Sequence, residues 1–367
     1  MGLRHGRAHA EEIGVYTRER VDLVAAGAWT NGPIARADVL DLAESMLDSH
    51  RVFDEELFDE LVAIAEGAGI SPAEAVVVGG FTDFVDTVRA QVGGRHPDSV
   101  VEDDCTAFIV PDHRATGGKG YYGQTWDMHD SATDHVLLLR IRPDHAPAAL
   151  VFTTTGCLGQ IGMNELGLCV GINNLVCTDG TPGVAWTSVV RGMLKAESAQ
   201  DALDVLLAAD LAGAHNYLIF DADGVGFNVE AMPSVREVTA LDDEPIVHTN
   251  HTLHPRTTAV QADKDAGLLA SSAARLARGQ ELLAVGYNDR PIDERRLMEV
   301  TRDPDAICQV AVEPFHIESS GAAIMRPVTG DFWACWGPPS HNDYKPIGLT
   351  PSSVPPTTPS NVRTVPL

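Results

Sequence analysis

The sequence changes character at Cys105, with helical periodicity before this residue and strand composition after it. Before it, apolar residues recur at helical spacing in segments 39–47 and 57–65, and Ser-Pro-Ala-Glu at 71–74 has the pattern of a helix N-terminus. After it, short segments rich in β-branched and aromatic residues predict strands. A helical layer followed by many antiparallel strands and further helices predicts an α+β protein with stacked sheets.

The expected elements after Cys105 are short and regularly punctuated by turns. Strands are predicted at residues 106–110, 121–126, 135–141, 149–155, 166–171, 217–221, 226–230, 321–326 and 332–336. Helices are predicted at residues 187–195, 199–209, 268–283 and 293–300. The tail, residues 346–367, is rich in Pro, Ser and Thr and is expected to be extended.

Charge and cysteine usage limit the partners and the compartment. The formal charge of −26 over 367 residues opposes binding to nucleic acids or to anionic membrane surfaces. We find no run of 18 apolar residues and no apolar core of a signal peptide in the first residues. The six Cys form no CxxC pair, which is typical of reduced thiols. We therefore expect a cytoplasmic protein.

Two motifs have ordinary explanations. Residues 118–123 match GxGxxG, but a polar turn precedes them and a Tyr-rich strand follows, so a hairpin turn is favoured over a dinucleotide site. His248, His251 and His254 would suit zinc by residue type, but no Cys or carboxylate completes a recognisable set. A metal-dependent hydrolase that uses these histidines stays an alternative, although we expect no metal.

Cys105 stands out by its position. It begins a strand directly after the acidic run Glu102-Asp103-Asp104, whose charges favour a site that solvent reaches. A hairpin centred on Thr116 would pair Cys105 with Asp127, whose Cβ atoms would then lie about 5 Å apart, and would place a carboxylate beside the thiol. A lone cysteine is otherwise most often a small buried hydrophobic residue.

Several segments, in this order, resemble the landmarks of the acyl-coenzyme A:6-aminopenicillanic acid acyltransferase family. These proteins are self-cleaving N-terminal-nucleophile hydrolases, also called the C45 peptidase family. The segments that carry the resemblance are Glu60–Gly69, Asp104-Cys105-Thr106-Ala107-Phe108, Gly123-Gln124-Thr125-Trp126-Asp127, Gly162–Leu168, Thr249-Asn250-His251 and Trp336-Gly337-Pro338-Pro339.

The resemblance implies a maturation step at Cys105. The family precursor cleaves itself before the nucleophile, so a cut between Asp104 and Cys105 would free a new α-amine. Cys105 would then supply both the thiol nucleophile and the base, because an α-amino group has a pKa of about 7.7–8.0 and is partly unprotonated near neutral pH. Asp104 stands where the family usually has Gly.

The same resemblance assigns the other site residues. Asp127 would orient or tune the new amine, and the Asn250 side-chain amide would donate to the tetrahedral oxyanion. Asn173 or Asn174 would supply a second polar contact. The remaining candidates for substrate or oxyanion contacts are Gln124 and a serine of the penultimate strand, Ser319 or Ser320.

The implied fold is a four-layer αββα sandwich of two antiparallel sheets between helical layers. Residues 1–104 would form the helical pro-segment or α chain, and residues 105–367 the β chain, both within one domain. The implied reaction opens a small-molecule amide through a Cys105 thioester, without cofactor, and acyl-coenzyme A would enter as a substrate of a transferase. The α and β chains would stay associated, and the oligomeric state is open.

Two further alternatives remain at this point. A choloylglycine-hydrolase-like amidase would share the fold without the Thr-Asn-His and Gln-Thr-Trp-Asp context. An uncleaved, non-catalytic binding protein would keep Cys105 as a buried residue.

Overall fold

Seven helices precede the first strand in the part of the chain that the structure describes. The computed structural model describes residues 1–93, 104–284, 286, 292–312, 316–349 and 364–366. The seven helices are α1 (Gly2–Ala8), α2 (Ala10–Ala25), α3 (Arg36–Glu44), α4 (Leu47–Phe53), α5 (Glu55–Ala68), α6 (Pro72–Gly79) and α7 (Phe81–Val92). Ser71 and Glu74 form the predicted capping box of α6. Gly69 ends α5 with a left-handed φ of 72°, which suits a residue without Cβ.

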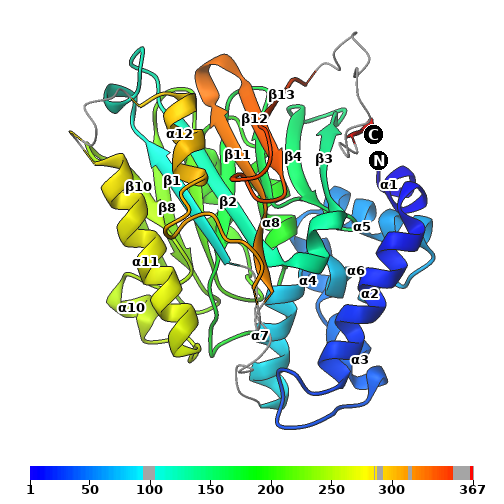
Figure 1. Ribbon diagram of the computed structural model, residues 1–367. Coiled ribbons are helices and arrows are strands. Elements are labelled where there is room, and N and C mark those ends of the chain that lie inside the picture. Colours follow the sequence, from blue (N-terminus) through cyan, green and yellow to red (C-terminus); the bar gives the residue numbers. More distant parts are fainter. Residues whose placement is uncertain (94–103, 285, 287–291, 313–315, 350–363, 367) are drawn as a thin grey trace.

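Two sheets form the centre of the molecule (Figure 1). The six-stranded sheet has the order β10 (Ile246–His248), β1 (Asp104–Val110), β2 (Tyr121–His129), β11 (Ile317–Arg326), β12 (Asp331–Trp336) and β13 (Lys345–Ile347). The eight-stranded sheet has the order β14 (Thr364–Pro366), β3 (Val136–Ile141), β4 (Ala149–Thr154), β5 (Ile161–Asn164), β6 (Cys169–Asn174), β7 (His215–Phe220), β8 (Gly226–Ala231) and β9 (Arg236–Ala240). All described strand pairs are antiparallel except β14 with β3.

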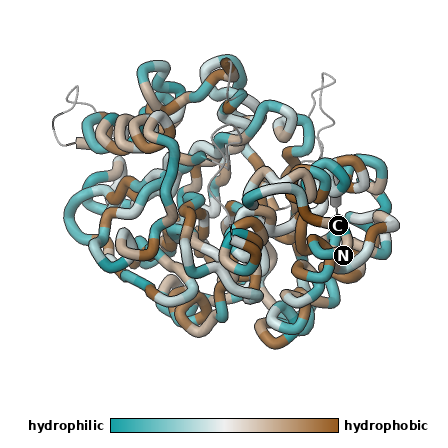
Figure 2. Tube along the Cα trace, turned by 90° about the horizontal axis from the view of Figure 1, so that it is seen from below, coloured by the Kyte–Doolittle hydropathy of each residue, from teal (hydrophilic) through white to brown (hydrophobic). Residues whose placement is uncertain are grey.

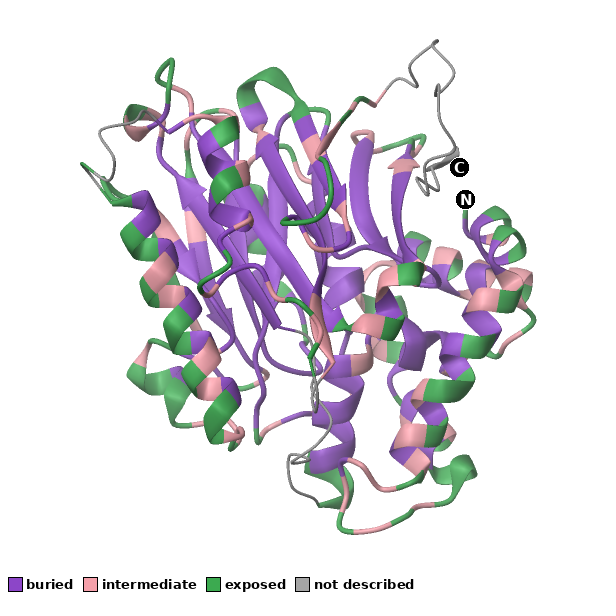
Figure 3. Cartoon of the chain, viewed as in Figure 1, coloured by how far each residue is buried: buried purple, intermediate pink, exposed green. Residues whose placement is uncertain are grey.

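Helices cover the outer face of each sheet. Helices α8 (Trp186–Met193) and α9 (Ala199–Ala208) pack on the eight-stranded sheet. Helices α11 (Ala266–Leu283) and α12 (Glu294–Thr301) pack on the six-stranded sheet, and the short helix α10 (Pro255–Thr258) precedes α11. A third apolar cluster fills the space between the sheets. These layers give the predicted αββα arrangement, in which the strands are largely buried and the outer helices alternate between buried and exposed residues (Figure 3).

The N-terminal helices have an apolar cluster of their own, built around Trp29, Phe84 and Ile64. Along the helices, hydrophobic and hydrophilic stretches alternate (Figure 2), as expected where only one side of a helix is buried. In the described part of the chain, no single helix is long and apolar enough to cross a bilayer. Helices α5 and α6 taken together have that length and apolar composition, but the chain bends by 105° between them.

Most of the predicted elements are confirmed, and the misses are short. Strand composition did not reveal β5, β9, β10 or β13, which have three to five residues each. The strand expected at 166–171 lies at Cys169–Asn174, because residues 164–168 form a turn in which Gly167 has a φ of 86°. The GxGxxG segment is the expected turn, and its last residues belong to β2. Residues 350–363 of the tail lie outside the described residues.

Candidate active site

The hairpin of β1 and β2 has a different register from the predicted one. Cys105 pairs with Trp126, and Asp127 pairs with Asp104. The prediction that Cys105 lies opposite Asp127 is therefore wrong by one residue. The connection between the strands has an even number of residues and includes the short helix η1 (Asp112–Arg114), so the turn is not centred on a single residue. Because side chains alternate along a strand, this slip puts Cys105 and Asp127 on opposite faces of the sheet.

The side chain of Cys105 faces the space between the two sheets. It is fully buried and belongs to the apolar cluster that contains Trp126 and Phe152. On the opposing sheet, the amide of Asn173 is linked to Asn216, which donates to Asn228 at 2.8 Å. The opposing sheet therefore carries a row of neutral amides whose positions are fixed by hydrogen bonds.

Asn250 lies against the backbone nitrogen of Cys105. The Cys105 N–H donates to Asn250 Oδ1 at 2.7 Å, and Asn250 Nδ2 donates to the carbonyl of Asn174 at 2.9 Å. The segment after β10 brings Asn250 here, and the hydroxyl of Ser272 accepts the Asn250 N–H at 2.9 Å. In the uncleaved chain, Asn250 thus holds the nitrogen that a cut before Cys105 would convert into an amine. The second asparagine candidate, Asn174, contributes its carbonyl to this arrangement.

The carbonyl oxygen of Cys105 accepts two side-chain donors. Arg275 Nη1 donates to it at 2.5 Å, and Asn173 Nδ2 donates at 3.3 Å. Asn250, Asn173 and Arg275 come from three different elements, yet they converge on one peptide unit. Cys105 is therefore held from both sides of its backbone, which fixes the position of its thiol.

Asp127 is buried on the outer face of the sheet. Ser319 donates to its Oδ1 at 2.5 Å, which is a short, charge-assisted geometry. Burial raises the pKa of Asp127 to about 7, whereas Arg275 and the Ser319 hydroxyl act to lower it and Asp104 acts to raise it. A carboxyl with such a pKa changes protonation state near neutral pH.

The structure distinguishes the two serine candidates and places Gln124. Ser320 accepts a hydrogen bond from Thr133 at 2.9 Å, so Ser319 is the serine beside Asp127. Gln124 faces the inter-sheet space but is engaged locally, since Tyr122 donates to its Oε1 and its Nε2 donates to the Ile172 carbonyl, both at 2.5 Å. Gln124, two residues before Trp126 on β2, therefore links the two sheets by a hydrogen bond.

Arg275 is the main residue that the sequence analysis missed. It lies on α11, is 0% exposed, and its Nη2 is 3.1 Å from Asp104 Oδ2 and 3.0 Å from Asn250 Oδ1. Asp104 itself is buried, so the expectation that solvent reaches the acidic run is wrong at this residue; Glu102 and Asp103 lie outside the described residues. The missed signal was a charged residue at a position where the helical period predicts a buried one, in the series Leu268, Ser272, Arg275, Gly279, Leu282.

Glu230 is a second residue that sequence reasoning missed. Its carboxylate accepts from His248 Nε2 at 3.1 Å, from the N–H of Leu253 at 2.5 Å and from the hydroxyl of Thr257. These hydrogen bonds lower the pKa of Glu230 against the opposing effect of burial. Glu230 thereby ties β8 to the segment that carries Asn250.

The three histidines of the His-Thr-Asn-His-Thr-Leu-His segment have separate partners. His248 contacts Glu230, His251 Nδ1 lies 2.7 Å from the Ser272 hydroxyl, and His254 caps α10 through Arg256 N–H. Each histidine thus has a structural contact of its own in this segment.

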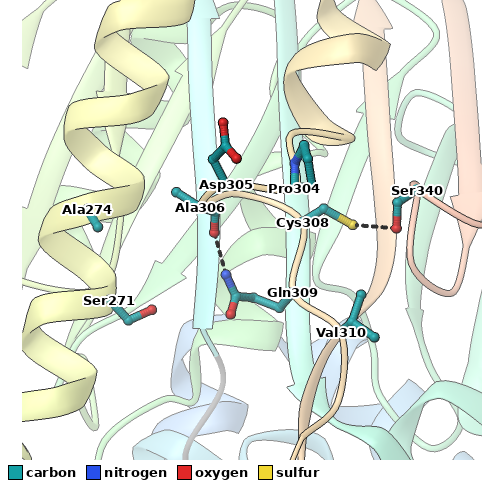
Figure 4. Close-up of a pocket in the computed structure, with 9 residues that line it drawn as sticks. All are labelled: Ser271, Ala274, Pro304, Asp305, Ala306, Cys308, Gln309, Val310 and Ser340. Atoms are coloured by element: carbon teal, nitrogen blue, oxygen red, sulfur yellow. Dashed lines mark hydrogen bonds between the residues drawn. The ribbon is translucent and has the colours of Figure 1, made fainter.

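A cavity of about 410 Å³ lies between α11 and the segment after α12 (Figure 4). Ser271, Cys308 and Gln309 are among its lining residues, and Cys308 donates to Ser340 at 3.2 Å. The backbone N–H of Gln309 donates to the Ser319 hydroxyl at 3.0 Å. The cavity wall is therefore connected through Ser319 to Asp127.

Comparison with a solved structure supports the fold of this chain. A mutant of the conjugated bile acid hydrolase from Clostridium perfringens superimposes with a TM-score of 0.52 at 12% identity, covering 71% of this chain and 98% of that one, and shows the N-terminal-nucleophile hydrolase fold. Penicillin V acylase from Agrobacterium tumefaciens matches at a TM-score of 0.37 and 14% identity, over 63% of this chain and 83% of that one.

Sequence comparison identifies the family. One relative from Emericella nidulans is described as the 40 kDa form of acyl-coenzyme A:6-aminopenicillanic-acid-acyltransferase. It is 25% identical to this chain over 198 residues, which is 53% of this chain and 52% of that protein. The chain thus matches about half the length of this relative. The family model described as acyl-coenzyme A:6-aminopenicillanic acid acyl-transferase matches residues 114–339, more than half of the chain, including Asp127, Asn173 and Asn250. The protein therefore belongs to the acyl-coenzyme A:6-aminopenicillanic acid acyltransferase family.

Proposed function

We propose that this protein is a self-cleaving cysteine amidase or acyltransferase that acts on a small-molecule amide through a Cys105 thioester. The observation that carries the proposal is the fixation of the Cys105 peptide unit. Its nitrogen is held by Asn250 and its carbonyl by Arg275 and Asn173, at the buried start of β1. A residue that only fills the core would not need three polar side chains on its backbone.

Maturation would begin with attack of the Cys105 thiol on the carbonyl carbon of Asp104. A C–S bond forms, the C–N bond breaks, and the nitrogen of Cys105 takes a proton to become an amine. Water then hydrolyses the thioester, which leaves a new α-carboxylate on Asp104 and the free thiol of Cys105. This route needs the fold to place the sulfur against a planar amide, which otherwise resists attack.

Turnover would use the same sulfur with the new amine as base. The amine accepts the thiol proton, the thiolate attacks the substrate carbonyl, and the amine returns the proton to the leaving nitrogen. Asn250 is proposed as the oxyanion donor and Asp127 as the carboxylate that orients the amine. Water completes hydrolysis, whereas an acceptor amine completes acyl transfer; an acyl-coenzyme A thioester would serve as acyl donor in the transferase case.

The location proposed for this enzyme is the cytoplasm. All six cysteines are free and buried, and Cys105 must stay a thiol for the mechanism to operate. A reducing compartment keeps such thiols unpaired.

The experiment is denaturing mass spectrometry of the wild type and of Cys105→Ala after long incubation. The proposal expects two associated chains of 104 and 367 − 104 = 263 residues from the wild type and a single chain from the variant. A wild type that hydrolyses amides as a single chain would exclude the free amine as base. Cleavage of both proteins at 104/105 would assign the cut to a contaminating protease.

A further inference from the structure

Arg275 has a carboxylate partner that maturation would remove. Its Nη2 lies 3.1 Å from Asp104 Oδ2, and the side chains are 1% and 5% exposed. Asp104 is the last residue before the proposed cut, so it would become a chain terminus that is free to leave the position that it holds in the uncleaved chain. Because a buried guanidinium without an anion is strongly unfavourable, the departure of Asp104 would leave a place beside Arg275 for another anion.

The guanidinium has a further unused donor. Within the described residues, Arg275 Nε is buried and has no hydrogen-bond partner. Nη1 is engaged by the Cys105 carbonyl and by the Thr106 hydroxyl at 3.2 Å. A free carboxylate could accept from Nε and Nη2 together, which is the bidentate geometry that arginine favours. Asp104, which is tethered through its backbone, uses only Nη2.

The position of this anion relative to the sulfur follows from the two reactions. In maturation the acyl group transferred to the Cys105 sulfur is that of Asp104, and in turnover it is that of the substrate. Both thioesters share one sulfur, and the nitrogen that leaves in each case must lie at or beside the Cys105 amine. The substrate carbonyl would therefore occupy nearly the place of the Asp104 carbonyl, and its next carbons the place of the Asp104 side chain.

We infer that the mature enzyme prefers four-carbon acyl groups whose fourth carbon is a carboxylate, and that Arg275 determines this preference. The acyl part of Asp104 is a four-carbon chain with a carbonyl at one end and a carboxylate at the other. The matching substrate class is the succinyl-type mono-amide. The inference rests on the proposed function, because it needs both the cut and the thioester.

The reaction balances without another reagent. The Cys105 sulfur bonds to the first carbon of the succinyl group, the C–N bond breaks, and the departing amine receives a proton from the Cys105 ammonium. Water then cleaves the C–S bond, which yields succinate and restores the thiol.

The test compares two chromogenic amides of equal chain length, N-succinyl-p-nitroanilide and N-butyryl-p-nitroanilide, on the cleaved wild-type enzyme. A charge-assisted hydrogen bond to a buried arginine should raise kcat/KM for the succinyl amide by at least about tenfold. In Arg275→Gln, the ratio of kcat/KM for the succinyl amide to kcat/KM for the butyryl amide should fall to about one, whatever the overall rate. Arg275→Lys should restore part of this ratio. Arg278→Gln is the matched control, because Arg278 lies about one turn further along α11 and pairs with Asp303 and Asp305 instead of Asp104. It should keep the wild-type ratio.

A second measurement covers variants that fail to fold. On wild-type enzyme hydrolysing the butyryl amide, succinate should inhibit at a concentration at least about tenfold below that of butyrate. Equal rates for the two amides, together with equal inhibition by succinate and butyrate, would overturn the inference and leave the proposed function intact. In that case Asp127 would be the anion that stays beside Arg275. Loss of the chromogenic activity for every amide from a properly cleaved enzyme would instead overturn the proposed function.

Discussion

The two faces of β1 at Cys105 differ in chemistry. Towards the other sheet, the carbonyl of Cys105 accepts from the neutral amide of Asn173, which is linked in turn to the amide of Asn216. Towards α11, the neighbouring positions carry charge, in Asp104, Asp127 and Arg275. Neutral amides keep their dipoles at all pH values near neutrality, whereas a buried carboxyl can titrate there. The inner face therefore sets geometry, and the outer face makes the site sensitive to charge and pH.

The largest expected effect comes from Asn250, the residue that contacts both Cys105 N–H and Arg275. Asn250→Ala should lower kcat by about 100-fold or more, because loss of one preorganised oxyanion donor typically costs this much. Steady-state kinetics on the cleaved enzyme and a thermal unfolding curve would be measured together. If Asn250 only stabilises its turn, turnover would be unchanged and stability would fall by about 1 kcal/mol.

Asn250→Asp sharpens the same test. The aspartate keeps the oxygen that accepts from Cys105 and Arg275 but replaces the Nδ2 donor with a second oxygen. An oxyanion donor role predicts that this variant is as slow as Asn250→Ala. Substantial activity in Asn250→Asp would instead assign the residue to holding the Cys105 nitrogen.

On the outer face, Asp127→Asn should fold and lose activity or self-cleavage by about tenfold or more. The substitution preserves volume but removes the negative charge that would orient the amine, and hydrogen bonds to charged groups contribute about 1.5–3 kcal/mol. The readouts are the rate of precursor cleavage by mass spectrometry and kcat on the cleaved form. Wild-type rates for both would show that Asp127 is only a buried partner of Ser319.

The pH dependence of stability provides a third comparison, on uncleaved Cys105→Ala protein. The pKa of Asp127 is raised from 3.8 to about 7, so the folded state binds a proton more tightly than the unfolded state. The resulting stabilisation is fully present below about pH 4 and is lost as pH rises towards 7, with a slope of at most about 1.4 kcal/mol per pH unit.

Adding Asp127→Asn to that protein should remove this slope. The free energy of unfolding of both proteins is measured with urea between pH 4 and 7. The slope is obtained from the difference between the two free energies, in which the titration of other groups cancels. Parallel curves would mean that Asp127 stays ionised in the folded chain, paired with Arg275.

Motifs predicted the inner face better than the outer face. The resemblance pointed to Cys105, Asn173 and Asn250, which the structure brings together around one peptide unit. It did not reveal Arg275, because α11 contains none of the segments that carry the resemblance and offers only a charged residue at a buried spacing. The hairpin register also failed, since a one-residue change in a turn alters every pairing and moves Asp127 to the other face.

The smallest expected effect separates two adjacent serines on the outer face. Ser319 donates to Asp127 Oδ1, and this hydrogen bond lowers the pKa of Asp127. Ser319→Ala should therefore raise that pKa, by about one unit if the bond contributes near the lower end of the range for charged groups. Since the ionised carboxylate is the proposed active form, the rising limb of the kcat/KM profile should move to higher pH by the same amount. Ser320→Ala is the control, because Ser320 bonds to Thr133 and should leave the limb in place. Equal displacement in both variants would indicate a general loosening of β11, and no displacement in Ser319→Ala would mean that the rising limb belongs to the Cys105 amine and not to Asp127.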